Sequence, residues 1–246
     1  MQSSLHIKND LSMDKSRIYE GLAIMVGLIV LGYMIPVAVK DYRSFDRTVD
    51  VKGLCEVEMP ADKVIWPITF KVMSDDIIDI YTQTENNVEI VKKFLTDGGI
   101  DAAEISVSTP KVSDKFAQEY GANERRFRYL STSVVTVCTK DVSKVLVLMD
   151  QQMELLKKGV AISENAWDNP VQFAFEGLND IKPEMVEEAT RNARLTAEKF
   201  AQDSGSRLGK IKNASQGTFS IDDRDSNTPH IKKIRIVTYV TYYLKN

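Results

Sequence analysis

Histidine and cysteine are the residue types that most often carry catalysis or hold metals, and this 246-residue chain has two of each. His6 lies in a polar N-terminal tail and His230 at the start of the predicted last strand, so no Ser/His/Asp or Cys/His set is evident. Cys55 and Cys138 fall on separate predicted strands, which leaves a zinc site short of ligands. We expect no catalytic residue and no metal ligand. Both cysteines are interpreted as buried free thiols, with a disulfide as the alternative in an exported domain.

The acidic run at residues 222–225 has the composition of a calcium site but lacks the ligand spacing, central glycine and closing glutamate of an EF-hand loop. No glycine-rich phosphate loop or dinucleotide fingerprint is present, so we expect no cofactor. The formal charge is −3, and no run of Lys/Arg stands beside aromatic residues. Nucleic acid is therefore not an expected partner.

Residues 21–39 form an uncharged stretch of nineteen residues. The predicted strands and helices that would position a site follow it. As a helix it would be about 28 Å long, close to the ~30 Å thickness of a bilayer's hydrocarbon core. We expect a signal-anchor helix that crosses the membrane once. Its anchor residues are Gly21, Leu22, Ile24, Val26, Leu28, Ile29, Val30, Leu31, Ile35, Val37 and Val39.

Three other interpretations of this stretch compete with the anchor. A cleaved signal peptide is disfavoured because Pro36 would stand three positions before a cut after Ala38, where a small residue is needed. A buried helix of a soluble domain is disfavoured because no polar stripe interrupts the apolar surface. Ala23 and Gly27, four residues apart, would allow two such helices to pack closely, and this remains open.

Alternating apolar residues predict strands at 47–58 and 64–72, joined as a hairpin through residues 59–62. Pro67 cannot donate to a sheet, so it is expected at a strand edge or a bulge. Further strands are predicted at 105–107, 127–139, 160–163, 171–176 and 231–244. Residues 113–126 are predicted to form a polar hairpin loop reaching away from the body, and 222–229 a second loop.

Three amphipathic helices are predicted, at 76–96, 141–158 and 183–204, ending at Gly98-Gly99, Gly159 and Gly205. In the third, Pro183 is placed in the first turn and four alanines form the inward face. Mixed helices and hairpins indicate an α+β fold with largely antiparallel sheets, in one domain or two small ones. The residues assigned to the inward faces are Ile77, Ile80, Tyr81, Thr84, Val88, Val91 and Leu95; Val142, Val145, Leu146, Met149, Met153 and Leu156; and Ala189, Ala193, Ala197 and Ala201.

Several of these segments together resemble the SIMPL domain family, long described only as a domain of unknown function. They are the first strand through Gly53, the Trp66-Pro67 pair, the alanine helix, and the Gly205–Ile211 segment with Leu208 and Gly209. The family includes a periplasmic immunogenic protein of Brucella and the YggE-type envelope proteins. The resemblance covers residues 47–246 and implies an exported bacterial envelope protein of two packed subdomains, with ring-like oligomers in some relatives and no established catalytic residues.

The expected organisation is a cytoplasmic tail (1–20), the membrane helix (21–39), a linker (40–46) and a periplasmic SIMPL-like domain (47–246) in the bacterial inner membrane. Basic residues near the helix number three on each side, so this orientation rests on the short tail and the long following domain. We expect a non-catalytic protein that acts by self-assembly or by binding an envelope partner. The alternatives are a small-molecule or metal-binding stress-response module and an enzyme of unrecognised mechanism.

Overall fold

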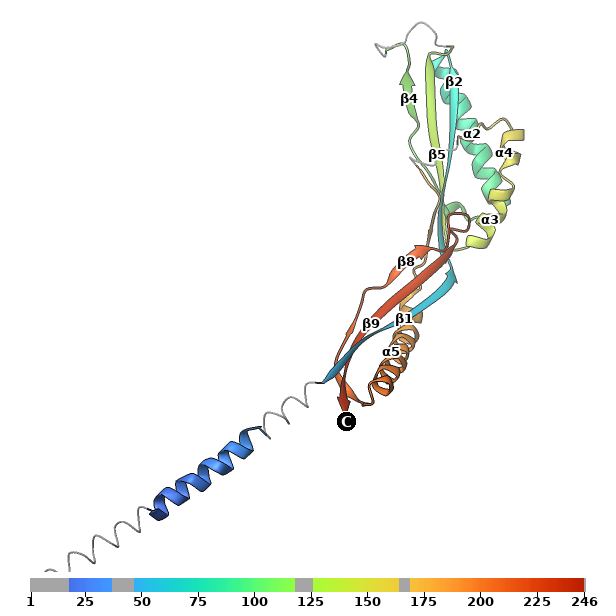
Figure 1. The fold of residues 1–246 in the computed structure, drawn as a ribbon. Coiled ribbons are helices and arrows are strands. Elements are labelled where there is room, and N and C mark those ends of the chain that lie inside the picture. Colours follow the sequence, from blue (N-terminus) through green and yellow to red (C-terminus); the bar gives the residue numbers. More distant parts are fainter. Residues whose placement is uncertain (1–17, 37–46, 118–125, 164–168, 246) are drawn as a thin grey trace, which may run out of the picture. The chain divides into compact units, whose positions relative to one another are not determined.

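The computed structural model describes residues 18–36, 47–117, 126–163 and 169–245. Its first element is an apolar helix, Ile18–Pro36, which is long and apolar enough to cross a membrane (Figure 1). The helix begins three residues before the predicted start, so the last three residues of the predicted tail belong to it. The remaining tail, the 40–46 linker, Val37 and Val39 lie outside the described residues. A signal sequence would satisfy the same length and composition criteria.

The remaining elements form two mainly antiparallel sheets with helices, which confirms the α+β class (Figure 1). In the four-stranded sheet β9 (Ile231–Lys245) lies between β1 (Thr48–Pro60) and β7 (Arg207–Gln216), and β8 (Ser220–Asp223) also pairs with β9. In the five-stranded sheet β3 (Ile105–Val107), β5 (Tyr129–Thr139), β2 (Lys63–Ser74) and β6 (Gln172–Ala174) follow in that order, and β4 (Lys111–Asp114) also pairs with β5.

Two compact units divide the chain. The first unit comprises residues 1–53, 190–216 and 238–246, and the second comprises 54–189 and 217–237. Each has its own packed core. The boundary passes along β1, β9 and helix α5 (Leu178–Asp203), so these long elements contribute residues to both units.

The predicted hairpin of the first two strands is wrong, because β1 and β2 belong to different sheets. Only Ala61 and Asp62 separate them, and both residues are held by backbone groups elsewhere. The Ala61 amide donates to the His230 carbonyl at 2.8 Å, and the Asp62 amide donates to Ala174 at 3.0 Å. The Asp62 carboxylate accepts from the amides of Glu176 and Gly177, each at 2.7 Å. These bonds carry the chain from one sheet into the next, whereas a hairpin would return it to β1.

One face of the five-stranded sheet packs on α2 (Ile77–Asp97), α3 (Val142–Asp150) and α4 (Met153–Lys157). Alternate residues of β2 supply this face because successive side chains of a strand point to opposite sides. Phe70 is fully buried at its centre, and Val135 and Val137 of β5 lie beside it in the same core. The β2 residues that form this core are Val64, Trp66, Ile68, Phe70 and Val72.

Helix α2 matches its prediction, except that Asp76 is the N-cap and Ile77 and Tyr81 are exposed. The single helix predicted at 141–158 is wrong, since the chain forms α3 and α4 with a break at Gln151-Gln152. The break rotates the later residues, so Leu155 is buried while Met153 and Leu156 are exposed. A continuous 3.6-residue period would have buried the latter two.

The alanine face of α5 is confirmed, since Ala189, Ala193 and Ala197 are fully buried and Ala201 nearly so. In the first unit, Ala193 and Ala197 pack against Val51, Val240 and Tyr242. In the second unit, Ala189 packs against Cys55, Met185, Ile234 and Ile236. Small side chains permit this close approach of helix and sheet. The helix begins five residues before the predicted start, at the point where Asp62 holds Gly177, so Pro183 lies inside it.

Strands β7 and β8 were not predicted. Nearly all their residues are exposed, and the pairing of β7 with β9 shifts register twice between Leu208 and Asn213. An edge strand without a buried face and with bulges does not show the two-residue period. Pro67 lies within β2 at a position that is unpaired on one side, which agrees with its prediction at a strand edge. Its missing amide faces the β2 edge between the stretch paired with β6 and the stretch held by Ala161 and Ser163.

We expect Ala193→Leu to lower the free energy of unfolding by about 1–3 kcal/mol, because the larger side chain has no space between α5 and the four-stranded sheet. The matched control is Gln202→Leu, an exposed position of the same helix, which should change it by no more than about 0.5 kcal/mol. Urea unfolding of the full chain measures both. Equal midpoints for the two variants would show that the alanine face is not tightly packed.

Candidate functional site

The face of the five-stranded sheet opposite its helices is the principal open surface of the second unit. Across β2 and β5 it presents the pairs Pro67/Thr136, Thr69/Val134 and Lys71/Thr132. In Figure 1, helices α2, α3 and α4 all lie on the other side of this sheet. No helix of the described chain covers this face. Thr69 is buried there, whereas Lys71, Thr132 and Thr136 are half-exposed and accessible to a ligand.

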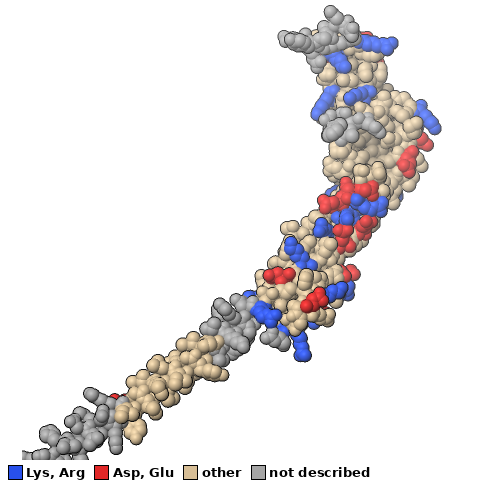
Figure 2. Space-filling model, viewed as in Figure 1, with Lys and Arg blue, Asp and Glu red and all other residues tan. Residues whose placement is uncertain are grey.

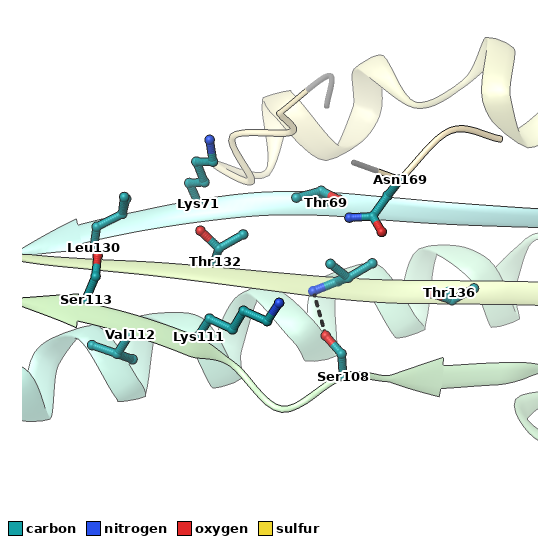
Figure 3. Close-up of a pocket in the computed structure, with 11 residues that line it drawn as sticks. Thr69, Lys71, Ser108, Lys111, Val112, Ser113, Leu130, Thr132, Thr136 and Asn169 are labelled. Atoms are coloured by element: carbon teal, nitrogen blue, oxygen red, sulfur yellow. Dashed lines mark hydrogen bonds between the residues drawn. The ribbon is translucent and has the colours of Figure 1, made fainter. Parts of the chain in front are cut away.

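Two lysines flank one threonine on this face. Lys71 of β2 and Lys111 of β4 are both register partners of Thr132 in β5, so the three form a row across three strands. At the usual strand spacing the Cα atoms of the two lysines are about 10 Å apart. We call these residues the lysine row. Figure 3 shows both lysine side chains on the open side of the sheet, with Asn169 reaching over β2.

The lysine row borders a hollow of about 720 Å³ (Figure 3). Its floor carries hydroxyl groups, and the Ser108 hydroxyl accepts a hydrogen bond from the Val134 amide at 3.3 Å. Among the described residues the lining contains no acidic residue, histidine or cysteine, and neither lysine has an ion-pair partner. The lining residues are Thr69, Lys71, Ser108, Lys111, Val112, Ser113, Leu130, Thr132, Val134, Thr136 and Asn169.

Asp114 is the carboxylate nearest to Lys111 along β4, and it is already engaged. Two nitrogens of the Arg128 guanidinium donate to its Oδ2 atom at 3.0 and 3.1 Å. This hydrogen bonding holds the pKa of Asp114 below its usual value. Asp114 is therefore paired with Arg128 and does not form an ion pair with Lys111. Ammonium and hydroxyl donors at this spacing suit carboxylate or phosphate groups, and the row has no group that would serve as a nucleophile–base pair.

Comparison with known families gives one match. A family model described as SIMPL, a protein of unknown function (DUF541), matches residues 49–233. The chain belongs to the SIMPL family. The matched residues begin in β1 and end in β9, and the apolar helix Ile18–Pro36 precedes them. No curated protein matches the chain, so the nearer likeness to the Brucella and YggE-type proteins remains an expectation.

The SIMPL motif residues have structural places in the fold. Gly53 and Trp66 are buried, and Leu208 packs against the core of the first unit. A Cβ atom at Gly209 would lie 2.7 Å from the carbonyl oxygen of Tyr243, so only glycine fits there. Gly205 has a φ of 66°, which favours glycine after the last turn of α5. None of these residues lines the hollow in the described structure.

The histidine and the two cysteines of the SIMPL domain do not line the hollow. His230 lies edge-on to Phe173, with ring centroids 6.0 Å apart. Cys55 and Cys138 are both free thiols, as preferred from the sequence, but only Cys55 is buried. Burial raises the pKa of the Cys55 thiol, with the Glu184 carboxylate adding to the effect. Cys138 is exposed because it lies on the open face of β5, so its predicted burial is wrong.

The acidic run at 222–225 is part of a strand and a turn. Asp222 and Asp223 belong to β8, and the Asp223 carboxylate pairs with the ammonium group of Lys232. Asp225 accepts from the amides of Asn227 and Thr228, each at 2.8 Å. Hydrogen bonds from the Thr228 hydroxyl and from Arg224 lower the pKa of Asp225. The Asp223 and Asp225 carboxylates are occupied by local contacts, and no metal-ligating cluster occurs among the described residues.

Sequence reasoning missed the lysine row, although one signal was available. The alternation of β2 and β5 assigns Lys71 and Thr132 to the outward face, but no sequence pattern pairs β4 with β5 in this register. Lys111 stands just before the segment predicted as a loop, and its strand extends over Ser113 and Asp114. The other residues of that loop that the structure describes are 115–117 and 126, and residues 118–125 lie outside the described chain.

We expect Lys71→Gln and Lys111→Gln to change the free energy of unfolding by no more than about 0.5 kcal/mol each, because both side chains are accessible and make no ion pair within the described chain. Asp62→Ala is the contrasting variant. It removes an acceptor for two backbone amides and should cost about 1–3 kcal/mol. Urea unfolding compares them, and a lysine variant as unstable as Asp62→Ala would give that lysine a structural role.

Proposed function

We propose that this SIMPL protein is a non-catalytic, membrane-anchored protein of the bacterial cell envelope that acts by binding further copies of itself or an envelope partner through the lysine row. The observation that carries the proposal is the open, positively charged face of the five-stranded sheet. Antiparallel sheets often have one solvated face. Here that face holds two lysines without a counter-ion in the described chain, which makes it complementary to an acidic surface.

The charge of the second unit supports self-association in particular. Its sequence contains 18 Lys/Arg and 27 Asp/Glu residues, a formal charge of −9. The lysine row is therefore a positive site on an acidic unit, and a second copy offers the complementary charge. Figure 2 shows carboxylates gathered with basic side chains in one band of this unit. The ion pairs Lys233–Glu56 and Lys63–Glu176 lie within this unit.

The hollow's volume supports a second candidate function. About 720 Å³ falls within the range of small-molecule sites, so a small anion such as a phosphate or a carboxylic acid is the competing ligand. Small-molecule sites are usually enclosed clefts or cavities, whereas this hollow is an open sheet surface. This difference favours a protein partner.

The anchor proposal rests on the helix Ile18–Pro36 and on the long domain that follows it. Apolar side chains are exposed along its length, and a bilayer would bury them. With an uncleaved helix, the short N-terminal tail faces the cytoplasm and the SIMPL domain faces the periplasm. Confinement to a plane also raises the effective concentration of neighbouring copies, so a modest interface suffices for assembly.

Topology can be tested by fusing alkaline phosphatase after Asn246 of the full chain. We expect an active fusion in intact cells, because this enzyme folds only after export to an oxidising compartment. The protein purified from membranes should retain residues 1–20 by mass spectrometry. An inactive fusion would reverse the orientation, and a mature N-terminus near Lys40 would replace the anchor with a cleaved signal peptide.

Assembly through the lysine row can be tested on the full chain in detergent by light scattering, with crosslinking of the same chain in membranes. We expect an oligomer that Lys71→Glu/Lys111→Glu converts to a monomer, because the substitution places acidic groups against an acidic surface. The control, Lys93→Glu/Lys157→Glu, makes the same charge change at exposed helix positions of the same unit and should stay oligomeric.

A wild-type monomer at tens of micromolar, with no crosslinked multimer in membranes, would contradict self-association. Equal masses for both double variants would exclude the lysine row as the interface. Calorimetric titration with inorganic phosphate distinguishes the small-anion function. Binding that disappears in Lys71→Glu/Lys111→Glu, by a protein that remains monomeric, would replace the protein partner with that second candidate.

A further inference from the structure

The first unit has the opposite charge to the second. Its globular part, residues 47–53, 190–216 and 238–245, contains nine Lys/Arg and only three Asp/Glu residues, a formal charge of +6. The chain as a whole carries −3. This part of the protein is therefore basic although the whole chain is acidic. Its positive charge is complementary to an anionic partner.

Four of these basic residues lie toward one end of the four-stranded sheet, where the chain enters the domain. Arg207 at the start of β7 is the register partner of Lys245 at the end of β9. Arg47 lies beside them, since its carbonyl accepts from the Leu244 amide at 2.8 Å and its guanidinium donates to the Ser206 hydroxyl at 3.1 Å. Lys210 follows in the same strand as Arg207. We call Arg47, Arg207, Lys210 and Lys245 the basic end; Figure 2 shows blue side chains there.

The pairing of Arg207 with Lys245 is unfavourable within the protein itself. Like charges directly opposite each other on neighbouring strands repel, and this repulsion destabilises the sheet. Both residues are exposed, and neither has an acidic partner within the described chain. An external anion held between the two strands would remove the repulsion, which is the local evidence for a ligand at this position.

The short connection between the apolar helix and β1 limits which anions the basic end can reach. Pro36 ends the apolar helix and Arg47 precedes β1, so ten residues connect them. Even fully extended, ten residues span only about 35 Å. If the helix crosses the membrane, as proposed above, the basic end cannot move farther than this from the bilayer surface. The phosphate groups of anionic lipids are then the most concentrated anions within its reach.

We propose that the basic end binds the anionic headgroups of the membrane in which the helix is anchored, and so holds the four-stranded sheet at the bilayer surface. Each basic residue near an anionic surface raises the equilibrium constant for membrane binding by about fivefold. The attraction is screened over about 10 Å at 0.1 M salt and about 3 Å at 1 M, so high salt releases the contact. The inference depends on the anchor and is independent of the lysine row.

The test uses the full chain in nanodiscs containing a rhodamine-labelled lipid. A fluorescent donor is attached at Asn213→Cys on β7 in a Cys138→Ser background, while the native Cys55 is buried. We expect energy transfer about twofold higher with anionic phosphatidylglycerol present than in phosphatidylcholine alone, and a return to the lower value in 1 M salt. Arg207→Glu/Lys210→Glu/Lys245→Glu should abolish the difference.

The control variant, Lys93→Glu/Lys157→Glu/Lys158→Glu, makes the same charge change at exposed positions of the second unit and should keep the difference. Melting curves confirm that each variant is folded. Equal transfer in the two lipid compositions, or a loss of the difference in both triple variants, would overturn the proposal while leaving the anchor intact. A chain absent from the nanodiscs would instead refute the anchor, and with it this inference.

Discussion

The Asp62 carboxylate sets the connection between the two sheets. It accepts the amides of Glu176 and Gly177, while the neighbouring Ala61 amide bonds to His230. Four segments meet there: the end of β1, the end of β6, the start of α5 and the start of β9. Hydrogen bonds to an ionised acceptor are about twice as strong as neutral ones. The nearby Lys63–Glu176 ion pair is exposed, so it contributes little beyond this.

The crossing at Asp62 also explains why a polar face is left open. Because β2 leaves β1 and enters the other sheet between β5 and β6, it carries apolar residues on one side only. All three helices of that sheet pack on this apolar side. The other side then presents Lys71, Thr132 and Thr136, all half-exposed, while Thr69 on the same side is buried. The lysine row thus depends on strand register, because a one-residue shift of β2 would turn Lys71 toward the core.

Much of the fold follows from short-range patterns, since the apolar helix, α2, β5, β9 and the alanine face of α5 were all predicted. The apolar helix is marked by its lack of charge, and each of the others has a buried face with a regular period. The failures occur where distant residues decide the outcome. The Ala61–Asp62 connection depends on partners more than a hundred residues away, and β7 is ordered by β9 without a core of its own. The lysine row depends on the register of β4 against β5, which no local pattern specifies.

The division of the net charge between the two units is also not specified by any local sequence pattern. The value of −3 combines a first unit of +6 with a second unit of −9. At physiological salt, charges interact over about 8 Å, so a surface responds to local charge and hardly to the total. An anionic bilayer therefore attracts the first unit and repels the second. The same separation leaves the lysine row as a positive site on the unit that lipids repel, where an acidic protein surface has less competition from headgroups. Two basic sites on one chain can thus select different anionic partners because the charges around them differ.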